Sequence, residues 1–308
     1  MPYDISNKLK IAVTTRALFK LEDENRIYEE QGADEYEKYQ ISKEKDILER
    51  GAAYSLIKSL LSINDIEETR DQVEVIIVTR NNANTGIRVF NSLEHYRLPI
   101  TRGCFSGGAE LTPYLEALDV DLFLTANEKD AQKAIDAGIP AAVLLTHNIP
   151  DYQSADTNKI RIAFDGDAVI FAEDSELIYK QEGIEKFKKN EAQHANDPMR
   201  EGPFAKFLKV IGKLQQALGD NKDFIRTALI TARNAPSHER VIKTLREWDV
   251  RIDEMFFLGG ISKTPILKAF GAQIFFDDQK TYTEPASLIV PSGTVPYASD
   301  SVLNKYKN

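Results

Sequence analysis

The sequence is poor in cysteine and histidine, has no excess of positive charge, and contains no long apolar run. Its one cysteine, Cys104, cannot form an internal disulfide, which favours a reducing compartment such as the cytoplasm. The net charge of −9 argues against a general nucleic-acid-binding surface. No apolar run approaches the roughly 18 residues of a membrane span, and the first residues lack the apolar core of a signal peptide. We therefore expect a cytoplasmic globular protein that binds neither nucleic acid nor membrane.

Short apolar runs alternate with stretches of helical spacing along most of the chain. In the first half, strands are expected at 73–78, 101–105, 120–124 and 141–145, and helices at 85–96, 111–118 and 128–137. Strands that alternate with helices in this way are typical of an α/β fold with a parallel sheet. Residues 146–158, polar and interrupted by Pro150, then predict a linker.

The second half repeats the first at a nearly constant offset. With a shift of 152 residues, Thr79, the Phe-x-Gly-Gly stretch at 105–108 and the Thr-Pro pair at 112–113 fall on the same residue types at 231, 257–260 and 264–265. With a shift of 151, Ile11-Ala12 falls on Ile162-Ala163. Such an offset indicates an internal duplication. We therefore predict two Rossmann-like lobes, residues 1–150 and 159–308, each with a parallel sheet and related by pseudo-twofold symmetry.

The two copies differ in residues that could carry chemistry. Asp165-Gly166-Asp167 of the second copy is matched by Thr14-Thr15-Arg16 of the first, Lys263 by Leu111, and Asp277-Asp278 by Thr125-Ala126. Residues that both copies share are those that the fold needs, whereas the unshared ones are candidates for a site. The first lobe, 1–150, is therefore predicted to be degenerate and to lack catalytic residues, and the second lobe is predicted to carry them.

The candidate residues of the second lobe stand at the ends of expected strands. Asp165 and Asp167 follow the apolar run 162–164, Thr231 follows 228–230, Lys263 follows Gly259-Gly260, and Asp277-Asp278 follows 274–276. In an open parallel sheet, the carboxyl ends of the strands line one crevice. We therefore expect these carboxylates, the hydroxyl and the ammonium group to lie close together.

This set of groups suits phosphoryl transfer, in which positioning and charge neutralisation dominate. Ligands that are all oxygen suit Mg²⁺, and the candidates are Asp165, Asp167, Asp277 and Asp278. Asp165 would attack phosphorus as the nucleophile, while Asp167 would protonate the leaving alcohol and then activate water. Lys263 would supply a point charge for the phosphate and reduce its repulsion with Asp165.

The substrate contacts are expected around Thr231. Its hydroxyl and the neighbouring N–H of Ala232 are candidate phosphate donors, and Arg233 and Asn234 are candidates for contacts with phosphate or ribose. Each piece also has an ordinary explanation. Asp165-x-Asp167 fits a loop with two solvated acids, Thr231 a helix N-cap, Lys263 a solvated lysine and Asp277-Asp278 a turn. All four pieces together, in this order at strand ends, favour a catalytic site.

The order Asp-x-Asp, Thr, Lys, Asp-Asp resembles the haloacid dehalogenase (HAD) superfamily of Asp-nucleophile phosphatases. Longer stretches are similar to the cytosolic 5′-nucleotidase type I family within it. They are Ala-Phe-Asp-Gly-Asp-Ala-Val (163–169), Glu-Gly-Pro-Phe-Ala-Lys-Phe-Leu (201–208), Val-Pro-Tyr (295–297) and, in the first half, Val-Thr-Thr-Arg-Ala-Leu-Phe (13–19). The resemblance covers nearly the whole chain.

This resemblance implies Mg²⁺-dependent hydrolysis of nucleoside 5′-monophosphates, with AMP, IMP or deoxynucleotides as substrates, through an aspartyl-phosphate. It also implies a helical cap insert at about 172–224 and a homo-oligomer. Within that insert, the helical spacing of Phe204, Phe207, Leu208 and Ile211 favours core residues over a purine-stacking surface. Two alternatives stay open at this point: a phosphatase for another small phosphate ester, and a non-catalytic nucleotide sensor.

Overall fold

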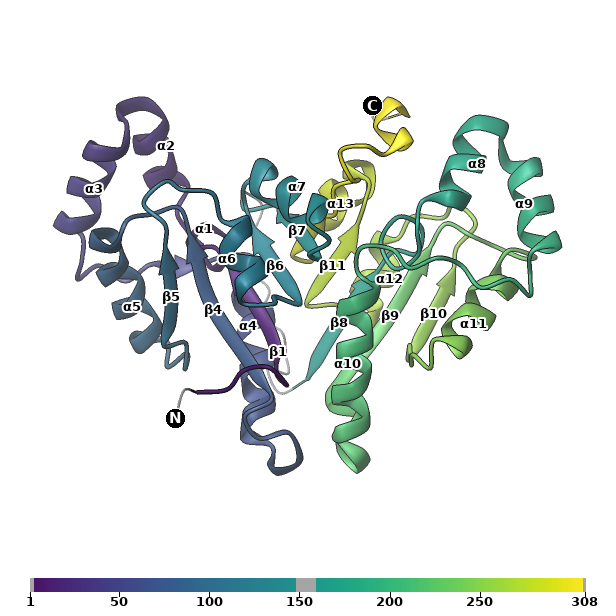
Figure 1. Ribbon diagram of the computed structural model, residues 1–308, viewed down its shortest axis with the longest axis horizontal. Helices are drawn as coiled ribbons and strands as arrows, with labels where there is room; N and C mark the ends of the chain where they lie inside the picture. The colour runs from purple at the N-terminus through teal and green to yellow at the C-terminus, as the bar shows by residue number, and fades with distance from the viewer. Residues whose placement is uncertain (1–2, 148–158, 307–308) are drawn as a thin grey trace.

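A computed structural model describes residues 3–147 and 159–306, so most of the predicted linker lies outside the described residues. One sheet of ten strands runs through the molecule, with helices on both of its faces (Figure 1). The strands of the first half are β1 (Leu9–Val13), β4 (Val73–Thr79), β5 (Arg102–Phe105), β6 (Leu122–Thr125) and β7 (Ala141–Leu144). Those of the second half are β8 (Ile160–Phe164), β9 (Ile225–Thr231), β10 (Glu254–Phe257), β11 (Ile274–Asp277) and β12 (Ser292–Thr294). A separate antiparallel ribbon pairs β2 (Phe19–Lys20) with β3 (Glu49–Arg50).

The helices follow the strands in the order that the alternation predicts. In the first half they are α1 (Thr15–Leu18), α2 (Glu22–Gln31), α3 (Ala33–Ser42), α4 (Tyr54–Leu61), α5 (Gly86–His95), α6 (Thr112–Ala117) and α7 (Glu128–Asp136). In the second half they are α8 (Asp174–Glu182), α9 (Ile184–Gln193), α10 (Ala205–Ala217), α11 (His238–Glu247), α12 (Thr264–Phe270) and α13 (Lys280–Ser287). Short 3₁₀ turns occur at Ser62–Asp65, Glu67–Thr69, Ala83–Thr85, Gly219–Phe224 and Val302–Tyr306.

The sheet confirms the predicted duplication. Its strand order is β10-β9-β8-β11-β12 in the second half, and the first half has the same order, β5-β4-β1-β6-β7. All pairs within each half are parallel, as the α/β prediction requires. Both β1 and β4 are buried along their whole length, as expected where helices cover both faces of a parallel sheet.

The two halves join through β7 and β12, which pair in antiparallel fashion. Val143 lies beside Thr125 of β6, and Thr294 lies beside the repeat-equivalent Asp277 of β11. Val143 and Thr294 are therefore equivalent positions, and they pair directly with each other. A pseudo-twofold axis thus passes through this junction, because a position that meets its own equivalent lies on the axis.

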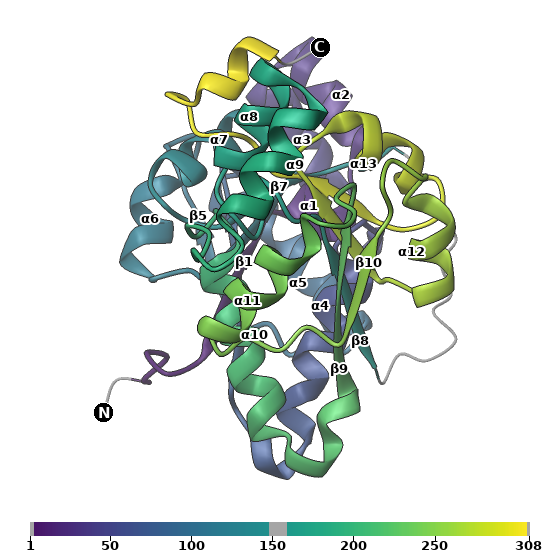
Figure 2. The same cartoon turned by 90° about the vertical axis from the view of Figure 1, so that its right-hand side faces the viewer.

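The segment 172–224, predicted as a cap, divides into two parts. The α8–α9 hairpin stands away from the sheet, as does its equivalent α2–α3, and both lie at the same end of the molecule as the C-terminus (Figures 1 and 2). In contrast, α10 packs on the sheet, with Phe204 and Phe207 fully buried and their ring centroids 6.4 and 6.2 Å from that of Phe164. These two phenylalanines are core residues, as their spacing predicts.

The junction between the halves leaves no room for a larger side chain at Gly293. A Cβ atom there would lie 3.0 Å from the Ala142 Cβ and 3.0 Å from the Leu144 Cδ2. We expect Gly293→Val to lower the free energy of unfolding by about 1–3 kcal/mol through overpacking, measured by urea denaturation. Gly212→Ala in α10 is the control, because an added Cβ meets nothing within 4 Å there. It should stabilise the helix by about 0.5–1 kcal/mol. A Gly293→Val protein as stable as the parent would contradict close packing at the junction.

Candidate active site

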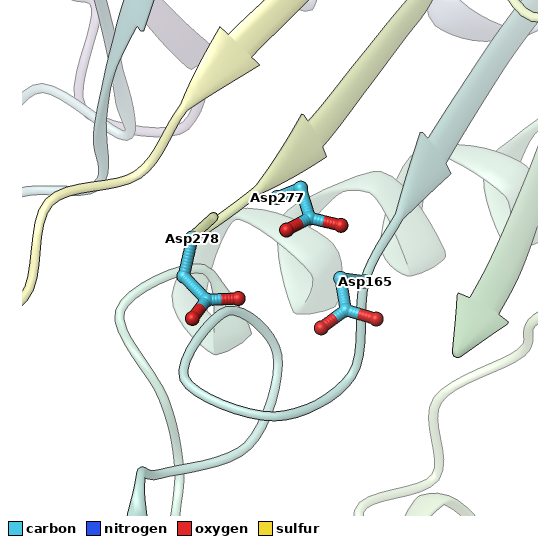
Figure 3. Close-up of side chains that lie close together, drawn as sticks. All are labelled: Asp165, Asp277 and Asp278. Atoms are coloured by element: carbon cyan, nitrogen blue, oxygen red, sulfur yellow. The ribbon is translucent and has the colours of Figure 1, made fainter. Parts of the chain in front are cut away.

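Three carboxylates meet where β8 and β11 end. Phe164 and Phe276 are paired neighbours in the two parallel strands, so Asp165 and Asp277, one residue further on, emerge side by side, and Asp278 follows. One oxygen from each of these three aspartates lies within 4.8 Å of the others, and all three residues are buried (Figure 3). The predicted convergence of Asp165 with Asp277 and Asp278 is therefore present.

Lys263 lies between two of these carboxylates. Its Nζ is 2.6 Å from the Asp165 Oδ1 and 2.6 Å from the Asp277 Oδ2. Burial opposes the charge of Lys263, but the two carboxylates outweigh it and hold its pKa well above the usual range. Lys263 is therefore buried and paired with two carboxylates, rather than a solvated lysine at a helix start.

The carboxylates exceed the positive charge that faces them. Burial, with Asp277 close by, raises the pKa of Asp165 to about 7 even though Lys263 opposes this. Burial and the neighbouring Asp277 also raise the pKa of Asp278 well above its usual value. The Asp278 Oδ1 is buried and has no hydrogen-bond partner among the described residues. A hard divalent cation fits this set of oxygen donors, since it would neutralise the excess charge and satisfy that oxygen.

Asp167 lies outside this group of three, and its partner is Arg233. The Arg233 Nε donates to the Asp167 Oδ2 at 2.8 Å, and the Nη2 donates to the Oδ1 at 2.6 Å. Arg233 also donates to Glu191 of α9, and its guanidinium lies 5.1 Å from the ring centroid of Phe187. The buried Arg233 therefore ties the Asp-x-Asp loop to the α8–α9 hairpin.

The other predicted substrate residues alternate between buried and exposed. Thr231 is buried, and its Oγ1 accepts from the Arg233 N–H at 3.2 Å. Ala232 and Asn234 are exposed, so both can face a ligand. Asn234 also packs on the turn before Lys263, because a Cβ added at Gly259 would lie 3.0 Å from the Asn234 Nδ2.

Glu191 and Tyr297 were missed as site residues. Glu191 accepts from Arg233, Arg240 and Ser175, and the Tyr297 hydroxyl donates to Asp278. The internal repeat of the sequence contains a signal that could have identified Glu191. At the repeat offset Glu191 falls on Gln40, just as Arg233 falls on Asn81, so both members of this ion pair are unshared between the copies.

A pocket of about 340 Å³ opens beside Asp278 at the boundary between the halves. Its lining includes Lys180 of α8 and Tyr297, and the first half contributes Gln132 of α7. The Gln132 side-chain amide donates to the backbone oxygen of Tyr297 at 2.8 Å, so the two halves are connected at this wall. The carboxylate site thus adjoins a space large enough for part of a small ligand.

The buried lysine between strand-end aspartates, with an Asp-x-Asp loop beside it, defines the HAD class of Asp-nucleophile phosphatases. A family model described as 5′-nucleotidase matches residues 1–302, and the chain belongs to this family. A human relative, cytosolic 5′-nucleotidase 1B, is 38% identical over 290 residues, which cover 91% of this chain and 47% of the relative. The chain thus spans about half the length of that relative. Within residues 3–147 and 159–306, no helix is both long and apolar enough to cross a membrane.

The ion pairs of Glu191 predict a loss of stability in acid. Burial would raise the pKa of Glu191, but Arg233 and the hydrogen bonds outweigh it and hold the pKa below its usual 4.5. A depressed carboxyl pKa stabilises the fold above about pH 4.5, and this contribution is lost as the pH falls further. At neutral pH we expect the free energy of unfolding of Glu191→Gln to be about 1–3 kcal/mol lower than that of the wild type. Between about pH 5 and pH 3 this difference should shrink.

Glu185→Gln is the matched control for Glu191→Gln, because this side chain on the same helix is 87% exposed. Urea denaturation across the pH range should show no change in stability for the control beyond about 0.5 kcal/mol. A constant difference between wild type and Glu191→Gln at all pH values would argue against a depressed pKa in the folded protein.

Proposed function

We propose that this protein is a Mg²⁺-dependent phosphatase that hydrolyses nucleoside 5′-monophosphates to nucleoside and phosphate. The observation that carries this proposal is the buried Lys263 between Asp165 and Asp277, with Asp278 alongside. The human relative is named a cytosolic 5′-nucleotidase, which supports a nucleotide substrate and the cytoplasm as the place of action. AMP, IMP and deoxynucleoside monophosphates are the candidate substrates.

Asp165, Asp277 and Asp278 are the residues that would hold the metal. When bound, Mg²⁺ supplies positive charge that neutralises the phosphate oxygens. Asp167, the fourth residue in the predicted ligand set, is occupied by Arg233 instead, so we assign it to proton transfer. In this division Asp165 is both a metal ligand and the nucleophile, Asp277 and Asp278 hold the metal, and Asp167 transfers protons.

The reaction proceeds in two displacements at phosphorus. A carboxylate oxygen of Asp165 forms a bond to phosphorus while the ester oxygen leaves, and Asp167 donates a proton to that oxygen. Asp167 then takes a proton from water, whose oxygen attacks the aspartyl-phosphate and frees Asp165. Lys263 and the hydroxyl of Thr231, with the N–H of Ala232, hold the phosphate oxygens in both steps.

The α8–α9 hairpin is connected to the acid–base group through one side chain. Arg233 contacts both Asp167 and Glu191 of α9, so a movement of the hairpin changes the hydrogen bonds of Asp167. We assign this hairpin the role of a cap that closes over the substrate and excludes water during the first displacement. The pocket beside Asp278 is our candidate for the nucleoside, with Gln132 as a contact from the first half.

Loss of the nucleophile should abolish turnover without loss of the fold. We expect Asp165→Asn to lower phosphate release from AMP and IMP by more than about a thousandfold while thermal unfolding is not weakened. The amide fits the same space, and it removes a buried charge. Asp174→Asn is the control, because this side chain in α8 is half exposed and pairs only with the exposed Arg200 in the described structure. Retained turnover in Asp165→Asn would remove Asp165 as the nucleophile, and a preference for sugar phosphates in the same assay would contradict the nucleotide substrate.

Magnesium should stabilise the folded protein through the three clustered aspartates. At a Mg²⁺ concentration about 100 times the Kd, binding adds about 2.7 kcal/mol to the free energy of unfolding. We expect calorimetry to show this gain in the wild type and in Asp174→Asn, and to show most of it lost in Asp277→Asn. Equal stabilisation of all three proteins by Mg²⁺ would place the metal elsewhere.

The homo-oligomer implied by the family resemblance stays a prediction. Large apolar side chains such as Ile261 and Leu288 are exposed, at 70% and 64%, and lie in the second half. They are surfaces that association could cover.

A further inference from the structure

The first half holds a pocket of about 310 Å³ at the place that corresponds to the carboxylate site of the second half. Thr14, Arg16, Thr125 and Ala126 line it, and these are the repeat equivalents of Asp165, Asp167, Asp277 and Asp278. The pocket also includes the Gly107-Gly108 turn. It belongs to the lobe without catalytic carboxylates, and the proposed hydrolysis makes no use of it.

Two backbone hydrogen bonds and one glycine conformation around this pocket repeat those of the catalytic site. The Thr14 N–H donates to the Leu124 oxygen at 2.9 Å, and the Asp165 N–H donates to the Phe276 oxygen at 2.8 Å. The Gly107 N–H donates to the Asn81 oxygen at 3.0 Å, and the Gly259 N–H donates to the Arg233 oxygen at 3.2 Å. Gly108 and Gly260 have φ values of +94° and +92°. This part of the framework that would surround a phosphate in the second half is thus present in the first.

The side chains on this framework differ in charge from those of the catalytic site. Positions 165, 167, 231–233, 263, 277 and 278 of the second half hold four carboxylates and two cations. Their equivalents in the first half hold two cations, Arg16 and Arg80, and no carboxylate. An anion that enters the first pocket therefore meets two arginines, each paired with one carboxylate, rather than a group of clustered carboxylates. Asp130 also lines the pocket and holds Arg80 in place at 2.5 Å, and Glu22 holds Arg16 at 2.6 Å.

A buried hydroxyl in this pocket has no partner. Thr14, at the position of the nucleophile, is 7% exposed, and its Oγ1 makes no hydrogen bond in the described structure. Leaving a buried hydroxyl unsatisfied is costly, and buried polar groups are nearly always paired. An oxyanion that reached the Oγ1 would accept a hydrogen bond from it.

Aromatic side chains cover the pocket from the α2–α3 hairpin. The hydroxyl of Tyr36 is held by the Asn81 amide at 3.2 Å, and the rings of Tyr28 and Tyr36 meet edge to face with centroids 5.8 Å apart. Tyr28 lines the pocket and is 53% exposed, so its ring is available to a planar base. Positive charge and an aromatic wall thus occur together.

We propose that the pocket of the first lobe is a second ligand site, which binds a nucleoside phosphate without a divalent cation. Arg16, Arg80 and the Thr14 hydroxyl contact the phosphate, and Tyr28 contacts the base. No bond is made or broken there, because the lobe has no carboxylate at the nucleophile position. The proposal does not rest on the hydrolytic activity, since it concerns binding to the other lobe.

The test measures binding of AMP by calorimetry in excess EDTA, with the full-length Asp165→Asn protein. Without metal, the carboxylates of the second lobe repel phosphate, so the remaining site is the one in the first lobe. We expect one saturable AMP site per chain with a Kd below about 1 mM. Adenosine, which lacks the phosphate, should bind at least about tenfold more weakly. Absence of a saturable AMP site, or equal binding of adenosine, would overturn the proposal.

Two matched pairs of variants, made in the Asp165→Asn protein, test whether AMP binds in the pocket of the first lobe. Ala126 is half-buried, so Ala126→Asp adds a carboxylate to the pocket, while Ala126→Asn adds the same bulk without charge. We expect Ala126→Asp to bind AMP about tenfold more weakly than Ala126→Asn. Thr14→Val should weaken binding about tenfold relative to Thr14→Ser, with no loss in thermal stability because the hydroxyl has no partner to lose. Equal AMP affinity within both pairs would show that AMP binds elsewhere and would refute this assignment.

Discussion

The contact on which the site depends is the buried lysine between two aspartates. Asp165, Asp277 and Asp278 would repel one another strongly in a site from which water is excluded, and Lys263 compensates only part of that charge. The remainder makes the site receptive to a divalent cation. This arrangement requires β8 and β11 to be neighbours. It also requires the Gly259-Gly260 turn, between β10 and α12, to place Lys263 beside the two aspartates. The strand order is therefore a condition of the chemistry.

The aspartates and the lysine lie in one half of a sheet whose other half has the same strand order. The two halves share their strand order and their turns, and they join into one sheet where Val143 meets its own equivalent, Thr294. A shared frame with different side chains can serve two purposes. One half has three clustered carboxylates, and the equivalent place in the other half has two arginines that are each paired with one carboxylate. The pocket beside Asp278 is lined from both halves, so the first half also contributes to the surroundings of the carboxylates.

Much of the fold was predictable because it depends on local patterns. Apolar runs such as 73–78 form strands, and the repeat offset alone identifies which positions of the two halves are equivalent. Asp165, Lys263 and Asp277 were predicted to converge because each stands at a strand end. The partner of Asp167 was not predicted, since Glu191 and Arg233 come from segments 24 and 66 residues away from it, and no local pattern links them. The division of 172–224 into a hairpin and a sheet-packed helix likewise depends on what α10 contacts.

The sequence by itself determined the duplication, the α/β class, and which half has aspartates at the equivalent strand-end positions, because each of these follows from residue type and spacing. Only the tertiary structure decided that three of the four aspartates lie together, two of them bonded to one lysine, while the fourth pairs with an arginine. It also decided that the halves share a single sheet and that, among the described residues, Thr14 is left with an unpartnered hydroxyl. These are properties of side chains that meet across strands and helices, where the direction of each side chain and the exclusion of water set the outcome.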